Sequence, residues 1–165
     1  MITPRAEFLM QQTYATLFSL ANKLQVKGDR YFKHLTSRQF MAMLAIVHLP
    51  EGEASLSNIA RKLGTTKQSV KQLITLMENN GYVHSVPSRR DKRAVNVIIT
   101  KSGKKATTED YDLGEKFLPD LFHEFTPEEM EILWNLLKKL YRFDGEEQDG
   151  FEEETAGNNL STGEL

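Results

Sequence analysis

Four cationic residues lie within five positions of this chain, Arg89, Arg90, Lys92 and Arg93, and an apolar, β-branched run follows them. Guanidinium and ammonium groups form charge-assisted hydrogen bonds with phosphate oxygens. In a solvated loop such a cluster binds nothing in particular. At the tip of a β-hairpin it would be held at a fixed point, where it could reach a nucleic-acid backbone or a narrow groove.

The distribution of charge favours a polyanionic partner. Residues 55–105 contain eleven Lys and Arg against two acids, a net charge of +9, whereas the remainder of the chain carries −11, and together these give the −2 of the whole chain. A basic block of this size is the electrostatic footprint of a nucleic-acid-binding surface, which the whole-chain pI conceals.

The elements around the cluster are those that could position it. The β-prone segments 82–86 and 94–99 flank the stretch PSRRDKR, which predicts a hairpin with a cationic tip. Upstream, SLSNIARKLG and TTKQSVKQLITLMENNG each predict a short helix, the second with Thr66 as N-cap and Gly81 as its stop. In that second helix Val70, Leu73, Ile74 and Met77 form an inner face, and the other face presents Lys67, Gln68, Lys71 and Gln72.

Helices are also predicted on both sides of this block. The first covers residues 5–27, and the second runs from 37 to 49 behind a capping box made by Thr36 and Gln39. After the hairpin, Thr100 caps a helix to about residue 117, and Thr126 with Glu129 caps a helix to about residue 142. Residues 144–165 hold eight acids and no bases, which predicts a disordered or loosely attached tail.

This order of elements predicts a mainly α fold of the α+β winged-helix type: helix, helix, helix–turn–helix, hairpin wing and two C-terminal helices. In such a fold the second helix of the helix–turn–helix lies in the major groove and the first braces it. The hairpin then reaches the neighbouring backbone or the minor groove. The apolar strands would fix the wing to the core while its tip delivers the guanidinium groups.

The stretch from Leu56 to Gly103 resembles the MarR (multiple antibiotic resistance regulator) family of transcription factors. The matching segments within it are LSNIARKLGTTKQSVKQLITLMENNGYV and DKRAVNVIITKSG, and LTSRQFMAML matches before the basic block. DKRAVNVIITKSG resembles the D-x-R wing signature of the family. With the flanking helices the resemblance covers about residues 5–142. Thr65 and Leu76 depart from the family pattern, which usually has an aliphatic residue and often an arginine at these positions.

The resemblance implies a homodimer that binds pseudo-palindromic double-stranded DNA, usually as a repressor. By position, Gln68, Ser69, Lys71 and Gln72 would meet bases, Thr66 and Lys67 would face phosphate, Arg93 would enter the minor groove, and Asp91 would orient it by bidentate pairing. With the rest of the wing, the predicted DNA-binding residues are Thr66, Lys67, Gln68, Ser69, Lys71, Gln72, Arg89, Arg90, Asp91, Lys92 and Arg93.

The resemblance also implies a division of labour along the chain. Residues 1–35 and 104–143 would form the dimer, residues 36–103 would bind DNA, and residues 144–165 would be the acidic tail. A small aromatic or anionic effector would bind in a cleft lined by the first two helices and the long helix after the wing. A sharper role for the tail is competition with DNA for the basic wing.

Other functional classes receive less support. A winged helix that binds only proteins is the alternative, although such a module has no need of +9 across its recognition helix and wing. No Gly-rich phosphate loop or nucleophile elbow suggests an enzyme. The chain has no cysteine and its four histidines are scattered, so neither a metal nor a cofactor is expected. Without a signal pattern or a membrane-spanning run, we expect a soluble, cytoplasmic protein.

Overall fold

A computed structural model of the protein has the fold of a winged helix with long flanking helices. The structure describes residues 2–89, 91, 93–148, 150 and 151. In this part of the chain the order is α1 (Pro4–Gly28), α2 (Ser37–His48), α3 (Leu56–Lys62), α4 (Lys67–Asn79), β1 (Val83–Pro87), β2 (Val95–Ile99), α5 (Lys101–Phe122), α6 (Pro127–Tyr141) and a short 3-10 helix, η1 (Arg142–Asp144). The predicted fold class and element order are thereby confirmed.

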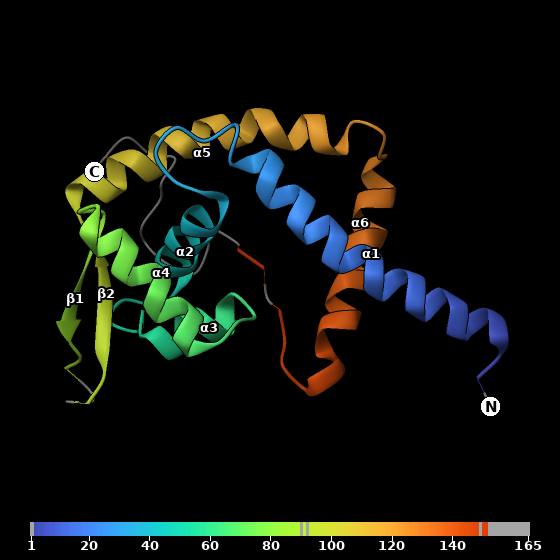
Figure 1. Cartoon of the computed structure of the whole chain (residues 1–165), viewed down its shortest axis with the longest axis horizontal. Helices are drawn as coiled ribbons and strands as arrows, with labels where there is room; N and C mark the ends of the chain where they lie inside the picture. Colours follow the sequence, from blue (N-terminus) through green and yellow to red (C-terminus); the bar gives the residue numbers. More distant parts are fainter. Residues whose placement is uncertain (1, 90, 92, 149, 152–165) are drawn as a thin grey trace.

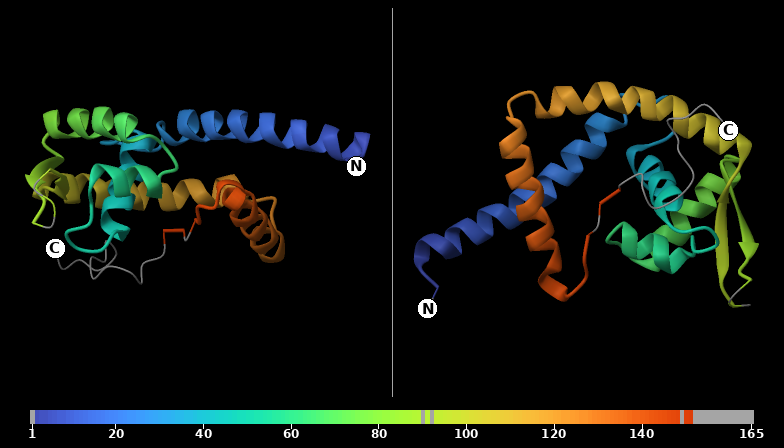
Figure 2. Two further views of the ribbon diagram at one scale, coloured as in Figure 1. Left: turned by 90° about the horizontal axis from the view of Figure 1, so that it is seen from below. Right: turned by 180° about the vertical axis from the view of Figure 1, so that it is seen from behind.

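The elements form a compact lobe, made by α2, α3, α4 and the hairpin, and a projecting arm, made by α1 and α6. Figure 1 shows α2, α3, α4 and the hairpin gathered at one end of α5, with α6 descending from its other end and α1 passing across α6 in this view. Figure 2 shows α1 extending away from that lobe. No helix in the described part of the chain combines the length and the apolar character needed to cross a membrane.

The core lies inside the lobe and is built by the apolar faces of α2, α3 and α4. Met43, Ile59, Val70, Ile74 and Met77 are at most 2% exposed. Because α2 packs on α3, β2 and α5 together, most of its apolar middle is buried, as its composition predicts. This burial fixes which face of α4 remains outside.

The hairpin is attached to the lobe at its base. Val83 pairs with Ile99 and Pro87 with Val95 in the antiparallel register. Val83 and Val97 are buried, whereas Val95, nearer the tip, is 37% exposed. The loop before α3 adds a third strand-like segment, because the N–H of Val97 donates to the carbonyl oxygen of Ala54 at 2.9 Å. These contacts hold the direction in which the wing projects.

Helix α5 is longer than the sequence predicts. It continues through Pro119 to Phe122 instead of ending near residue 117. Proline has a φ close to the helical value and removes a single N–H donor, and packing on both sides offsets that loss. The rings of Tyr31 and Phe117 lie 4.8 Å apart between centroids, and the Tyr31 hydroxyl donates to Oδ2 of Asp120 at 2.9 Å.

The first part of the acidic tail also differs from the prediction of a loose segment. After η1 the chain turns back toward the lobe, where Gly150 is buried and Phe151 packs against the core. Gly150 and Phe151 are therefore packed and not loosely attached, because the apolar ring of Phe151 contacts the core. Residues 152–165 lie outside the described residues.

The cap of α2 provides a test of local stability. Oγ1 of Thr36 accepts from the N–H of Gln39 at 3.3 Å, and Oε1 of Gln39 accepts from the N–H of Thr36 at 3.0 Å. Thr36→Ala is expected to lower the free energy of unfolding by about 1 kcal/mol, measured by urea denaturation. Thr108→Ala is the control, because that hydroxyl bonds a carbonyl inside α5 and caps no helix. Equal losses in the two variants would contradict the capping role.

Candidate nucleic-acid interface

The start of α4 is held by its own cap and by a tight turn from α3. Oγ1 of Thr66 accepts from the N–H of Ser69 at 3.1 Å, as predicted for an N-cap. Gly64 in the preceding turn has φ +62°, a conformation that favours glycine. A Cβ there would also lie 2.9 Å from the hydroxyl oxygen of Tyr141. The turn therefore fixes the angle between α3 and α4.

The outer face of α4 presents the predicted base-reading side chains. Lys67, Gln68, Lys71 and Gln72 are all exposed, opposite the buried Val70, Ile74 and Met77. Thr66 is exposed at the start of the helix, whereas Ser69 is half-buried and lines an apolar cavity. The structure thus brings the four long polar residues together on one face and places Ser69 away from them.

The described part of the wing tip presents exposed charged side chains. Arg89 and Arg93 are exposed, as is Asp91, while Arg90 and Lys92 lie outside the described residues. Oδ1 of Asp91 accepts from the backbone N–H of Arg93 at 2.9 Å. Among the described residues, Asp91 therefore holds the backbone at Arg93. Its bidentate pairing with the guanidinium stays a prediction. An acid two positions before an amide readily forms this local turn.

A groove of about 620 Å³ joins the recognition helix to the wing. Lys67 from the first turn of α4 lines it together with Asp91 and Arg93 from the wing. Its floor comes from the loop before α3 and from the first residues of that helix. Cations that are distant in the sequence therefore face one hollow of the surface.

Three residues of this groove were missed by the sequence analysis. Ser57 and Asn58 line it from α3, and Asn96 lines it from β2, where its Nδ2 donates to the carbonyl oxygen of Gly52 at 2.7 Å. Asn96 breaks the apolar run of β2 in the sequence, a weak signal for an outward-facing polar residue. Nothing in the spacing of Ser57 and Asn58 shows that the wing lies beside them.

A second, apolar cavity of about 680 Å³ lies between the arm and the lobe. Leu24 of α1, Met41 of α2 and Phe117 of α5 line it, which are the elements from which the effector cleft was expected. Residues of α3 and α4 line it too, as does Phe151 from beyond α6, and these were not anticipated. Arg38, Lys62 and Glu115 supply charged side chains to its lining.

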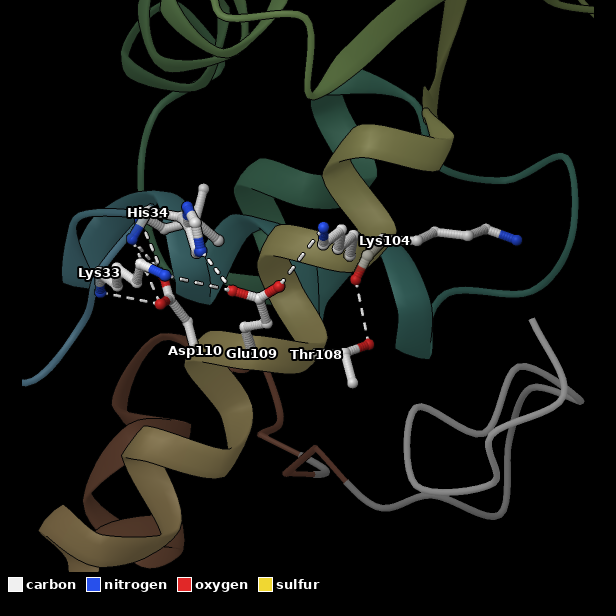
Figure 3. Close-up of polar contacts among 8 residues, drawn as sticks. Lys33, His34, Lys104, Thr108, Glu109 and Asp110 are labelled. Atoms are coloured by element: carbon white, nitrogen blue, oxygen red, sulfur yellow. Dashed lines mark hydrogen bonds and ion pairs between the residues drawn. The ribbon is translucent and has the colours of Figure 1, made fainter.

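A buried carboxylate fixes the connection between α1 and α2 to helix α5 (Figure 3). Asp110 is 0% exposed. Its Oδ1 accepts from the N–H of Lys33 at 2.8 Å, and its Oδ2 accepts from the N–H groups of His34 and Leu35 at 3.1 and 2.7 Å. Three backbone donors on one carboxylate set where the arm leaves the lobe.

The neighbouring Glu109 adds a side-chain contact to this clamp. Oε2 of Glu109 lies 2.7 Å from Nε2 of His34 (Figure 3). The hydrogen bond from His34 is the main reason why the pKa of Glu109 is lowered, and the charges of His34, Lys33 and Lys105 act in the same direction. Within the described part of the chain, no group of three His, Asp or Glu side chains is arranged to hold a metal ion.

Comparison with known proteins identifies relatives of one kind. The sequence profile of the MarR family matches residues 35–94. The uncharacterized HTH-type transcriptional regulator YwaE of Bacillus subtilis is 32% identical over 125 residues, which cover 75% of this chain and 73% of YwaE. The transcriptional activatory protein BadR of Rhodopseudomonas palustris is 34% identical over 100 residues, 58% of this chain and 57% of BadR. The chain thus spans little more than half of BadR.

Solved structures share the fold. A Staphylococcus aureus MepR–DNA complex superposes with a TM-score of 0.67 at 21% identity, covering 78% of this chain and 96% of MepR. The organohalide-sensing regulator RdhR, in a form bound to 2,4-dichlorophenol, has a TM-score of 0.70 at 17% identity, covering 83% of this chain and 81% of RdhR.

Proposed function

This chain belongs to the MarR family of winged-helix transcriptional regulators, and we propose that it acts as a homodimer that binds a pseudo-palindromic operator and represses transcription there. Family members are regulators and not enzymes, in agreement with the expected absence of catalysis. The observation that carries the proposal is the exposed polar face of α4, which shares a groove with the cationic wing. We expect such a regulator to act on DNA in the cytoplasm.

Each subunit would use α4 to read bases and the wing to hold the backbone. Lys67, Gln68, Lys71 and Gln72 face outward from a helix of the length that fits a major groove. Glutamine can pair with adenine through two hydrogen bonds, and lysine can contact guanine. Thr66 lies beside phosphate at the start of the helix in this arrangement. Ser69 acts through the cap, because its side chain is turned inward.

The wing would insert Arg93 into the minor groove next to the helix. Its backbone is held by Asp91, so the guanidinium remains available to the electronegative groove. Arg89 is exposed in the same turn. Arg90 and Lys92, although outside the described residues, belong to the same predicted set.

Dimerisation would use the apolar side chains of the arm. Helices α1 and α6 expose a set of large apolar residues: Phe8, Leu9, Met10, Tyr14, Phe18, Met130, Ile132, Trp134, Leu136, Leu137 and Leu140. Monomeric proteins rarely leave so many large apolar side chains in water. We therefore assign residues 1–35 and 104–143 to the dimer, residues 36–103 to DNA, and residues 144–165 to a C-terminal segment.

The apolar cavity would bind the effector that releases the operator. It lies where α1 and α5 meet α2 and the rest of the lobe, so a ligand there contacts both the dimer arm and the DNA-binding unit. Its apolar lining and its three charged side chains suit a small aromatic anion. A ligand that binds one placement of the lobe more tightly than another shifts the population toward it.

The first experiment is a salt series of binding to duplex DNA from the promoter region of the chain's own gene, compared with random duplex of equal length. We expect a clear preference for the promoter and an affinity that falls steeply with salt. No binding at low salt would reject the DNA proposal and favour the alternative, a winged helix that binds proteins. A reporter gene under the same promoter distinguishes repression from activation. The relative BadR is named a transcriptional activatory protein.

Base reading by α4 predicts a change in sequence preference. Gln72→Ala should lose about 1–3 kcal/mol of discrimination at the base pair that it contacts, and leave other positions of the operator unchanged. Selection from a randomised operator measures this. Asn79→Ala, in the last turn of α4 and also exposed, is the control and should keep the original preference. An unchanged preference in the Gln72 variant would remove that residue from the site.

A further inference from the structure

The chain beyond η1 contributes a wall to the apolar cavity. Phe151 lines that cavity and packs edge-on against the ring of His48, with centroids 5.9 Å apart and an interplanar angle of 89°. Nζ of Lys62 lies 5.1 Å from the centroid of the Phe151 ring, within the range of a cation–π contact. Nε2 of Gln148 donates to the carbonyl oxygen of Lys62 at 3.4 Å. The segment therefore contacts both α2 and the end of α3.

The same segment also contacts the arm. Gly150 is buried and has φ +81°, and a Cβ at this position would lie 3.3 Å from Cζ2 of Trp134 in α6. Its backbone thus passes directly beside the indole ring. Figure 1 shows this segment crossing from the end of α6 to the lobe. It joins an arm helix to the DNA-binding unit across the side of the cavity.

The composition of the segment marks Phe151 as its anchor. Between residues 144 and 154 it is the only apolar side chain, in the sequence DGEEQDGFEEE. Moving a phenyl ring out of water is favourable, whereas burying the neighbouring carboxylates is unfavourable. The cavity lining to which Phe151 belongs also contains the cations Arg38 and Lys62.

We propose that Gln148, Gly150 and Phe151 belong to a strap, and that Phe151 is part of the ligand-binding surface of the cavity. A small aromatic anion in the cavity contacts the Phe151 ring and is shielded from water on that side. Ligand binding and strap docking are then linked, so each stabilises the other. This inference rests on the proposed role of the cavity as the effector site. It adds Phe151 to the lining by α1, α2 and α5 that the sequence predicts.

Binding of anilinonaphthalene sulfonate, an aromatic anion with an environment-sensitive emission, tests the strap in the full-length protein. Phe151→Ala should weaken its affinity about tenfold, because the probe loses contact with one ring. Phe151→Leu should be intermediate. Gly150→Val, whose branched side chain disfavours φ +81° and collides with Trp134, should reproduce the alanine result without removing the ring.

Phe143→Ala is the matched control, since that ring lies in η1 and is 85% exposed. It should leave probe affinity unchanged. Without probe, acrylamide should quench the emission of Trp134, the only tryptophan, more strongly in the Phe151→Ala and Gly150→Val variants than in the native protein. Equal or tighter probe binding by Phe151→Ala would overturn the inference, and so would unchanged quenching.

Failure of the underlying proposal gives a different result. If the native protein does not bind the probe at all, the cavity is no aromatic-anion site, and the inference falls with it before any variant is compared. The operator-binding proposal is measured separately by the salt series and does not depend on either fluorescence signal.

Discussion

Replacing Arg93 with alanine is expected to weaken operator binding about tenfold and to make the remaining affinity less sensitive to salt. The side chain is exposed at the wing tip and lines the groove shared with α4. A cation in the minor groove also neutralises phosphate charge, so losing Arg93 should reduce the slope of log K against log salt by about 0.9. Titration of an operator duplex at several salt concentrations, followed by fluorescence anisotropy, measures both quantities.

The control for Arg93 is Lys116→Ala, which removes one exposed positive charge from α5 near the arm. If net charge alone steers the protein to DNA, the two variants should lose similar affinity. If the wing inserts as proposed, only the Arg93 variant should lose more than about twofold. A wing variant with native affinity and native salt slope would exclude Arg93 from the interface.

Replacing Asp110 with alanine is expected to lower the free energy of unfolding by about 3 kcal/mol. The substitution removes a fully buried carboxylate and leaves the backbone N–H groups of Lys33, His34 and Leu35 without their acceptor. Buried donors without partners lose their hydration without compensation, so each adds to the penalty. The stability of the Asp110→Asn variant should lie between that of the native protein and that of the alanine variant, because asparagine keeps one acceptor oxygen. Urea denaturation measures the difference.

The matched control is Asp112→Ala, an exposed acid two positions further along the same helix. It should change stability by less than about 0.5 kcal/mol. Because the clamp sets where α1 leaves the lobe, the Asp110→Asn variant should also tolerate operators with altered half-site spacing better than the native protein does. Native stability in the alanine variant would show that the clamp contributes little to the fold.

Local patterns were sufficient for most of the elements. Thr36, Thr66, Thr100 and Thr126 cap the helices at which they were predicted, because a capping bond connects residues only three positions apart. The two strands around the wing followed from β-branched residues bounded by turn signals. The inner and outer faces of α4 followed from the 3.6-residue period alone, so the polar set that includes Gln68 and Gln72 was visible before the fold was known.

Contacts between distant segments required the folded chain. Asp110 reads as an ordinary surface acid in a helix, and only the packing of α5 against residues 33–35 buries it. The bond from the Arg93 backbone amide to the Asp91 carboxylate was not expected, because it depends on the turn geometry of the wing. Phe151 looked like part of a solvated acidic tail, and the cavity that receives it is lined by helices that are far apart in the chain, from α1 to α5. Helical periodicity and capping are properties of neighbouring residues, but burial and cavity shape depend on which surfaces meet.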